Sequence, residues 1–284
     1  MKYRRIATCI ILLGALEILS TFPAATQAQE QNLEISDVTY TSENGKVSAK
    51  IYRLKDLPGP TATVLVLPGR GRDFQGLEWL MKPLAQKGYV VMAIGYRGIP
   101  VRYYLKDVED ARNAITYLES LPYVDRARIG IFGHSRGGMA ALMSAASGDK
   151  RIKSVVSASA PTDHFKSVEE KKLSAAHYPD RMRTRGTPPD EDPEYYRSIS
   201  PIYHAGQMRD VPILLIHGAQ DFLSFVDHSL NMYGALKVAG NRQAHIEVIV
   251  GAGHFYERGF GGNAYDEVVN LTTSWFDRFL REKK

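Results

Sequence analysis

The segment that decides the fold is "RIGIFGHSRGGMAALMSA", from Arg128 to Ala145. An apolar run leads into a group of glycines around Ser135, and a second apolar run follows. This order predicts a buried strand that passes directly into a helix. Gly133 and Gly137 let the backbone turn sharply and let the helix pack tightly on the strand. Ser135 would then stand on a tight turn with its hydroxyl projecting, as a nucleophile requires.

A second role is open to Ser135, because serine before a helix is also a common N-cap. An N-cap does not require the flanking glycines, so the pattern favours the nucleophile. The helix N-terminus next to it adds partial positive charge where an oxyanion would develop. A hydroxyl is a poor nucleophile until a base takes its proton. A matching base and its acceptor must therefore come from other parts of the chain.

Strands and helices are expected to alternate on both sides of this segment. A hairpin is predicted over 34–54, with its turn at Asn44-Gly45. Continuous apolar runs predict strands at 61–69, 88–98, 127–133, 152–161, 211–218 and 244–250. Helical spacing predicts helices at 74–87, 105–121, 139–147, 224–240 and 264–283. The sequence therefore predicts an α/β fold, with a mostly parallel sheet covered on both faces and an antiparallel hairpin at one edge.

The N-terminus has the pattern of a secretory signal peptide over residues 1–28. Basic residues precede the apolar run Ile6–Leu19, and small residues lead to a cleavage position near Ala28. The alternative, a membrane anchor, needs about 20 apolar residues, and Glu17 interrupts a run that is already short. We therefore expect an exported protein, periplasmic or extracellular, with no stable membrane association after cleavage. Residues 29–284 would form a single α/β domain, with a polar excursion at about 162–210 over the carboxyl edge of the sheet, where the active site is expected.

Composition excludes several classes of function. The only cysteine is Cys9, inside the predicted signal peptide, so cysteine catalysis and thiolate metal sites are excluded from the mature chain. The net charge is +5 without a basic run, which gives no reason to expect a nucleic-acid partner. The hydrophobic fraction of 44% is enough for a sizeable core.

Two loops offer the partners that Ser135 needs. His254 follows the last predicted strand, and Asp221 follows the strand before it. Parallel strands bring these loops to the same sheet edge as Ser135. The order Ser135, Asp221, His254 is the order of one triad-bearing fold. Among the alternatives, Asp221 could be a surface ion-pairing residue, and Asp227 lies in the following helix.

The remaining histidines are expected to be less suitable. His217 sits within a strand and is expected to be structural, and His134 must point away from the Ser135 side chain. His228 and His245 are expected on helix and strand surfaces. His254 is therefore the preferred base.

Backbone N–H groups would hold the oxyanion. Arg136 follows the nucleophile, and Arg70 lies in the glycine-rich loop after the strand at 61–69. The alternative for that loop is a plain tight turn. A set of arginines could ring the crevice with positive charge and favour an anionic substrate: Arg70, Arg72, Arg97 and Arg136, with the group Arg181, Arg183 and Arg185. The alternative is solvated surface arginine, because exposed arginine is common.

These residues resemble the α/β-hydrolases, and specifically the catalytic domain of the prolyl oligopeptidase family. The resemblance is carried by "GYRGIP", "DVEDARNAITYLESLPYVDRARIGIFGHSRGGMAAL", "SISPIYHAGQMRDVPILLIHGAQD" and "GAGHF". It implies Ser135 as nucleophile, Asp221 as the acid and His254 as base. Two departures weaken peptidase specificity: too few residues precede the first core strand for a β-propeller, and "PGRGRD" lacks the "HGG" often seen in the superfamily. The chain also resembles dienelactone hydrolases and small carboxylesterases.

The sequence therefore predicts a serine hydrolase that cleaves an ester or amide bond through an acyl-enzyme on Ser135. Its partner would be a small ester or a short peptide, and the chemistry requires no metal or cofactor. One alternative is a small exported serine peptidase, and another is a non-catalytic binding module that kept the fold.

Overall fold

The computed structural model describes residues 32–70, 74–97, 104–172 and 187–282. The predicted signal peptide lies outside these residues. The strands are β1 (Leu33–Ser42), β2 (Gly45–Leu54), β3 (Thr61–Leu67), β4 (Val90–Ile94), β5 (Val124–His134), β6 (Ile152–Ala158), β7 (Ile213–Gly218) and β8 (Ala244–Ile249). Each strand expected from the sequence is present, with ends that differ by a few residues.

Helices connect most of the strands. They are α2 (Glu78–Gln86), α3 (Tyr104–Glu119), α4 (Arg136–Ala146), α5 (His164–Lys172), α7 (Pro193–Ser198), α8 (Asp227–Val238) and α9 (Tyr265–Phe276). Shorter turns are η1 (Phe74–Leu77), η2 (Pro201–Met208), η3 (Gly259–Gly261) and the π-helical η4 (Asp277–Arg281). No described helix is long and apolar enough to cross a membrane.

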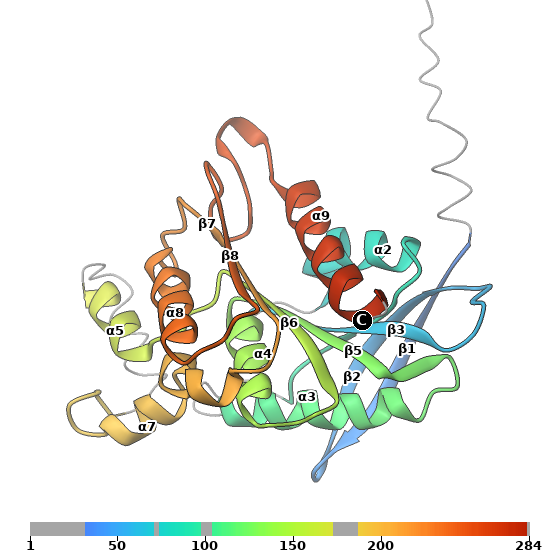
Figure 1. The fold of residues 1–284 in the computed structure, drawn as a ribbon, viewed down its shortest axis with the longest axis horizontal. Coiled ribbons are helices and arrows are strands. Elements are labelled where there is room, and N and C mark those ends of the chain that lie inside the picture. The colour runs from blue at the N-terminus through green and yellow to red at the C-terminus, as the bar shows by residue number, and fades with distance from the viewer. Residues whose placement is uncertain (1–31, 71–73, 98–103, 173–186, 283–284) are drawn as a thin grey trace, which may run out of the picture.

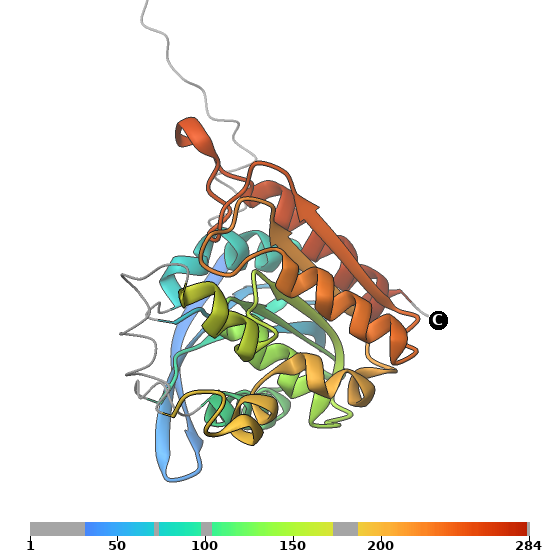
Figure 2. The same ribbon diagram turned by 90° about the vertical axis from the view of Figure 1, so that its left-hand side faces the viewer.

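The eight described strands form one sheet in the order β1-β2-β4-β3-β5-β6-β7-β8 (Figure 1). The pairs β1–β2 and β2–β4 are antiparallel, and the other neighbouring pairs are parallel. The hairpin therefore forms one edge of the sheet, as predicted, and β8 forms the other. Figure 2 shows the blue hairpin and the orange-red β8 at opposite sides of the molecule.

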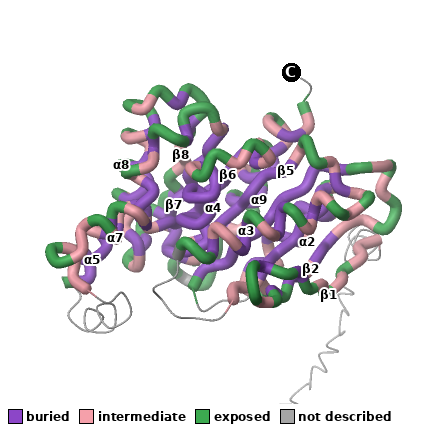
Figure 3. Tube along the Cα trace, turned by 90° about the horizontal axis from the view of Figure 1, so that it is seen from below, coloured by how far each residue is buried: buried purple, intermediate pink, exposed green. Residues whose placement is uncertain are grey.

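Both faces of the sheet are buried, because successive side chains of a strand point to opposite faces. In β3, Leu65 and Leu67 belong to one hydrophobic cluster, whereas Val64 and Val66 belong to the other. The first cluster includes residues of α3, α4 and α8, and the second includes residues of α2 and α9. Figure 3 shows the central strands as a continuous buried layer. The continuous apolar runs of the sequence are explained by this two-sided burial.

The turn between β5 and α4 is unusually tight. A Cβ atom at Gly133 would lie 2.0 Å from the carbonyl oxygen of Gly137. A Cβ atom at Gly137 would lie 2.0 Å from the carbonyl oxygen of Leu67, at the end of β3. These contacts are with backbone atoms, which cannot move aside as a flexible side chain can. The two glycines are therefore required for α4 to start directly against the sheet.

We predict that Gly137→Ala lowers the free energy of unfolding by about 3 kcal/mol or more, because the new methyl group collides with β3. The matched control is Gly234→Ala in α8, another helical glycine, where nothing lies within 4 Å of the added Cβ. That change should raise the free energy of unfolding by about 0.5–1 kcal/mol through helix propensity. Urea unfolding followed by circular dichroism measures both. Equal effects at the two sites would contradict the packing argument.

Candidate active site

Ser135, Asp221 and His254 lie together at the carboxyl edge of the sheet. Ser135 directly follows β5, Asp221 lies in the loop after β7, and His254 lies in the loop after β8. His254 Nε2 is 3.0 Å from Ser135 Oγ, and His254 Nδ1 is 2.6 Å from Asp221 Oδ2. The structure thus joins the three residues in one chain of hydrogen bonds. This is the geometry that lets a histidine take a proton from a serine hydroxyl.

Ser135 adopts a strained backbone conformation, with φ 55° and ψ −117°. Positive φ is uncommon for a residue with a Cβ and persists only where the surroundings fix it. Here the Ser135 N–H donates to the carbonyl of Ala158 at 2.7 Å, which ties the turn to the end of β6. Ser135 occupies the N-cap position of α4, but its side chain makes no capping hydrogen bond. Its hydroxyl faces His254 instead.

Asp221 is a buried carboxylate with a full set of donors. Oδ1 accepts from the backbone N–H groups of Leu223 and Ser224, both at 2.8 Å. Oδ2 lies 2.6 Å from His254 Nδ1 and 3.2 Å from His217 Nε2. Burial alone would raise the pKa of Asp221, but the hydrogen bonds from His217 and His254 hold it well below its ordinary value of 3.8. Asp221 is therefore ionised at neutral pH and acts only as an acceptor.

The ionised Asp221 fixes the state of His254. A carboxylate cannot donate, so Nδ1 of His254 carries a proton and Nε2 of the neutral ring is left as an acceptor toward Ser135. His254 is largely buried, whereas Ser135 is partly exposed to solvent. The base is thus shielded while the hydroxyl stays accessible to a ligand.

His134 supports the loop that carries His254, a contact that the sequence did not reveal. Its Nε2 lies 2.8 Å from the carbonyl oxygen of His254 and therefore donates to it. The two rings also lie close, with centroids 5.1 Å apart. Adjacency to Ser135 was visible in the sequence, but a contact across 120 positions was not.

The loop after β3 lies directly beside Ser135. A Cβ atom placed at Gly69 would be 3.3 Å from the Ser135 Cβ atom. Tyr96 Oη donates to the carbonyl of Pro68 at 2.8 Å and holds this loop in place.

The two predicted oxyanion donors are backbone N–H groups in segments next to Ser135. Arg70 follows Gly69 in this loop and is exposed, and Arg136 is the first residue of α4. The first N–H groups of a helix have no carbonyl partner within it. Both predicted oxyanion donors thus belong to segments that border Ser135.

The structure contradicts the hypothesis that Arg97 and Arg136 give the crevice free positive charge. Arg136 is buried and binds Asp107 through two hydrogen bonds of 2.5 and 2.7 Å. Arg97 binds Asp110 and Glu43, at 2.5 and 2.7 Å. Both cations are neutralised by acidic residues, so they hold α3 against neighbouring elements. Arg72 and the arginines of 181–185 lie outside the described residues.

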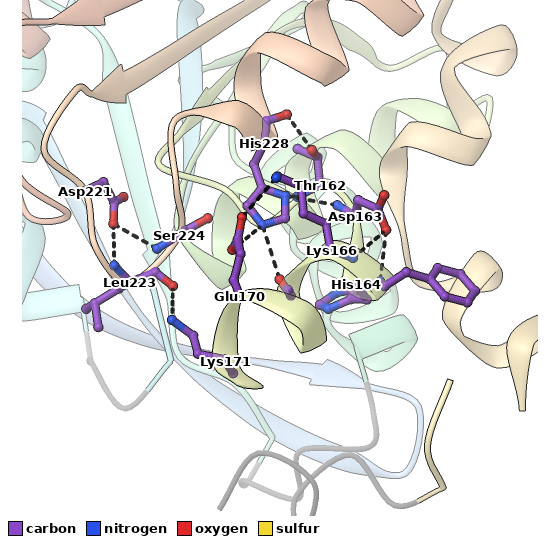
Figure 4. A network of polar contacts seen from close by, with 12 residues as sticks. Thr162, Asp163, His164, Lys166, Glu170, Lys171, Asp221, Leu223, Ser224 and His228 are labelled. Atoms are coloured by element: carbon purple, nitrogen blue, oxygen red, sulfur yellow. Dashed lines mark hydrogen bonds and ion pairs between the residues drawn. The ribbon is translucent and has the colours of Figure 1, made fainter. Parts of the chain in front are cut away.

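A second correction concerns His228, which was expected on a helix surface. It is completely buried, and its Nδ1 faces the N–H groups of Thr162 and Asp163 while its Nε2 lies 3.1 Å from Glu170 (Figure 4). Helical periodicity put His228 on the exposed face of α8, but the segment that begins at residue 162 packs over that face and buries it. His245 is exposed, as expected.

The same segment is tied to the loop of Asp221. Lys171, near the end of α5, donates from Nζ to the carbonyl of Leu223 at 2.7 Å, as Figure 4 shows. Leu223 in turn donates its N–H to Asp221. The helix predicted within 162–210 thus contacts the candidate site.

No group of three or more His, Cys, Asp or Glu side chains among the described residues is arranged to hold a metal ion. The candidate site is built from Ser135, His254 and Asp221 through their hydrogen bonds.

Comparison with known proteins places the fold among the α/β-hydrolases. A model of the prolyl oligopeptidase family matches residues 75–283. An acylaminoacyl peptidase from Pyrococcus horikoshii has a similar structure, with a TM-score of 0.79 and 22% identity over 94% of this chain and 45% of that protein. At this identity the similarity shows the fold alone.

Two curated relatives carry different names. The chain is 32% identical to the uncharacterized peptidase YtmA of Bacillus subtilis over 61% of this chain and 64% of that protein. It is 26% identical to esterase LipC of Mycobacterium tuberculosis over 73% of this chain and 56% of that protein. The chain thus spans less than two thirds of the length of these relatives.

We predict that Asp221→Asn lowers the free energy of unfolding by about 2 kcal/mol at about pH 7, because it removes a charged acceptor. A folded pKa below 3.8 contributes stability that is present above that pH and is lost as the pH falls below it. The gap between wild type and variant should therefore narrow from about pH 5 to about pH 2. Urea unfolding across this range measures it. A gap that stays constant would contradict an ionised Asp221.

Proposed function

Because the chain belongs to the prolyl oligopeptidase family, we propose that it is a serine hydrolase that cleaves ester or amide bonds through an acyl-enzyme on Ser135. The observation that carries the proposal is the hydrogen-bonded chain from Asp221 through His254 to Ser135. Asp221 accepts from His254, and His254 can accept from Ser135. Ser135 is the one residue of the three that is partly exposed to solvent.

In the first half of the reaction, Ser135 Oγ attacks the substrate carbonyl carbon while its proton passes to His254 Nε2. Asp221 stabilises the imidazolium that forms. The carbonyl oxygen becomes an oxyanion, for which we propose the N–H groups of Arg136 and Arg70 as donors. Collapse of this intermediate breaks the bond to the leaving group, which takes the proton from His254.

In the second half, water takes the place of the leaving group. His254 accepts a proton from water as its oxygen attacks the acyl carbon. A second oxyanion forms at the same donors, and its collapse releases the acid and returns the proton to Ser135. All of these steps use side chains and backbone groups of this chain alone.

Two classes of substrate fit the proposed mechanism, esters and short peptides. An esterase and a small peptidase would use the same three residues, and the relatives include proteins named as each. The pairing of Arg97 and Arg136 removes one reason to expect an anionic substrate. We propose an uncharged small ester first and a short peptide second. We also propose that the protein acts outside the cytoplasm, on the basis of its predicted signal peptide.

A non-catalytic binding module is the third possibility. Such a module has no need for a strained Ser135 or for a buried, ionised Asp221 aligned with His254. The strain at Ser135 costs stability without a return in binding, and the alignment of Asp221 with His254 serves no binding purpose, so both favour catalysis.

We predict that a fluorophosphonate probe labels the wild-type protein and does not label Ser135→Ala. The same variant should lower kcat/KM by about 1,000-fold or more on any substrate that the wild type cleaves. Substrates would be short-chain nitrophenyl esters beside alanyl, prolyl and dipeptidyl anilides. Fast esters with negligible anilides would identify an esterase, and comparable rates on anilides would identify a peptidase. Absence of labelling and of Ser135-dependent turnover would favour the binding module.

A further inference from the structure

A second histidine contacts the acid of the site. His217 is the penultimate residue of β7 and has no exposed surface. Its Nε2 lies 2.7 Å from the carbonyl oxygen of Ser224 and 3.2 Å from Asp221 Oδ2. Its Nδ1 lies 2.7 Å from Ser229 Oγ, at the start of α8. No step of the proposed reaction takes place on His217 itself.

The partners fix which ring nitrogen carries the proton. A carbonyl oxygen can only accept, so Nε2 of His217 carries a proton and donates it to Ser224, with Asp221 Oδ2 close to the same N–H. In the neutral ring, Nδ1 accepts the hydroxyl proton of Ser229. A hydrogen bond accepted at Nδ1 polarises the ring and strengthens donation from Nε2. Ser229 and His217 therefore form a polarised pair whose Nε2 approaches Asp221 Oδ2, the same oxygen that His254 contacts.

We propose that His217 is a positioning residue, which holds Asp221 and its loop in the orientation that aims His254 at Ser135. The proposal rests on the serine hydrolase chemistry proposed above. Asp221 accepts three hydrogen bonds, two of them from donors other than His254, and His217 Nε2 adds a close contact of 3.2 Å to Oδ2. Two belong to backbone atoms of its own loop, so His217 is the contact that ties the carboxylate to the rigid sheet.

His217 also fixes the shape of the Asp221 loop. By binding the Ser224 carbonyl, it closes the turn that places the Leu223 and Ser224 N–H groups on Asp221. The same loop is attached to the turn after β8, since the Gln220 N–H donates to the Ala252 carbonyl at 2.9 Å. A change at His217 would therefore move the acid relative to the base rather than alter the contact between substrate and protein.

The test compares His217→Leu, which cannot donate, with His217→Gln, whose amide can donate from the position of Nε2. We expect His217→Leu to lower kcat by about 10- to 100-fold with KM within about 2-fold of wild type, because misplacement of a catalytic group acts on the chemical step. His217→Gln should recover most of the loss. An unchanged kcat in His217→Leu, or no recovery in His217→Gln, would overturn the proposal.

A milder pair of variants serves if His217→Leu does not fold. Ser229→Ala removes the partner of Nδ1 and should lower kcat by about 3- to 10-fold. Ser154→Ala is its control, because Ser154 is equally buried and lies on β6 beside Pro212, at the opposite end of the sheet. It should leave kcat within about 2-fold of wild type. Equal kcat values in the two variants would overturn the proposal.

Fluorophosphonate labelling separates this inference from the proposed function. Wild-type protein that is not labelled would overturn the proposed function and the inference with it. Wild type and His217 variants that are labelled at the same rate, beside an unlabelled Ser135→Ala, would overturn only the role of His217. We expect labelling of His217→Leu to be slower than that of His217→Gln.

Discussion

The structure depends on the contact between the start of α4 and the end of β3, where two glycines allow backbone to touch backbone. This contact forces the chain to reverse within a single residue, and Ser135 absorbs the reversal in its positive φ. Ser159 and Tyr256 also have positive φ and follow β6 and β8. Three of the strained residues thus lie at the carboxyl edge of the sheet. Strain of this kind persists only where packing and hydrogen bonds fix the chain on both sides.

Electrostatics divides the charged residues into two groups. Asp221 is kept ionised by hydrogen bonds, although it is buried, and its charge is directed at His254. Asp107 and Asp110 instead neutralise two arginines and hold α3 in place. For Asp107, burial raises the pKa to about 6 against the pull of the Arg136 guanidinium. The Asp221 charge is therefore directed at the candidate site, whereas the charges of Asp107 and Asp110 are used to hold α3 in place.

The sequence predicted best those residues whose roles follow from their immediate neighbours along the chain. Ser135 could be found from the glycines around it, and Asp221 and His254 from their places after apolar strands. The roles of His134, His217 and His228 could not be found, because each depends on a partner that folding brings from a distant part of the chain or on the path of a loop. The arginines were misjudged for the same reason: each has an acidic partner on α3, and helical spacing alone does not show which cation each acid meets. The predicted signal peptide and much of the predicted excursion lie outside the described residues.

The two hydrophobic clusters on opposite faces of the sheet have a consequence for assembly. α4, which begins next to Ser135, packs into the cluster with Ala140 and Ala141. The turn that carries His254 is anchored in the other cluster by Ala252 and Tyr256. Neither half can align nucleophile and base by itself. A chain with only one layer formed holds an isolated serine or an isolated histidine, so the aligned set of Ser135, Asp221 and His254 would form as a late, all-or-none event in folding and would report the completed native state.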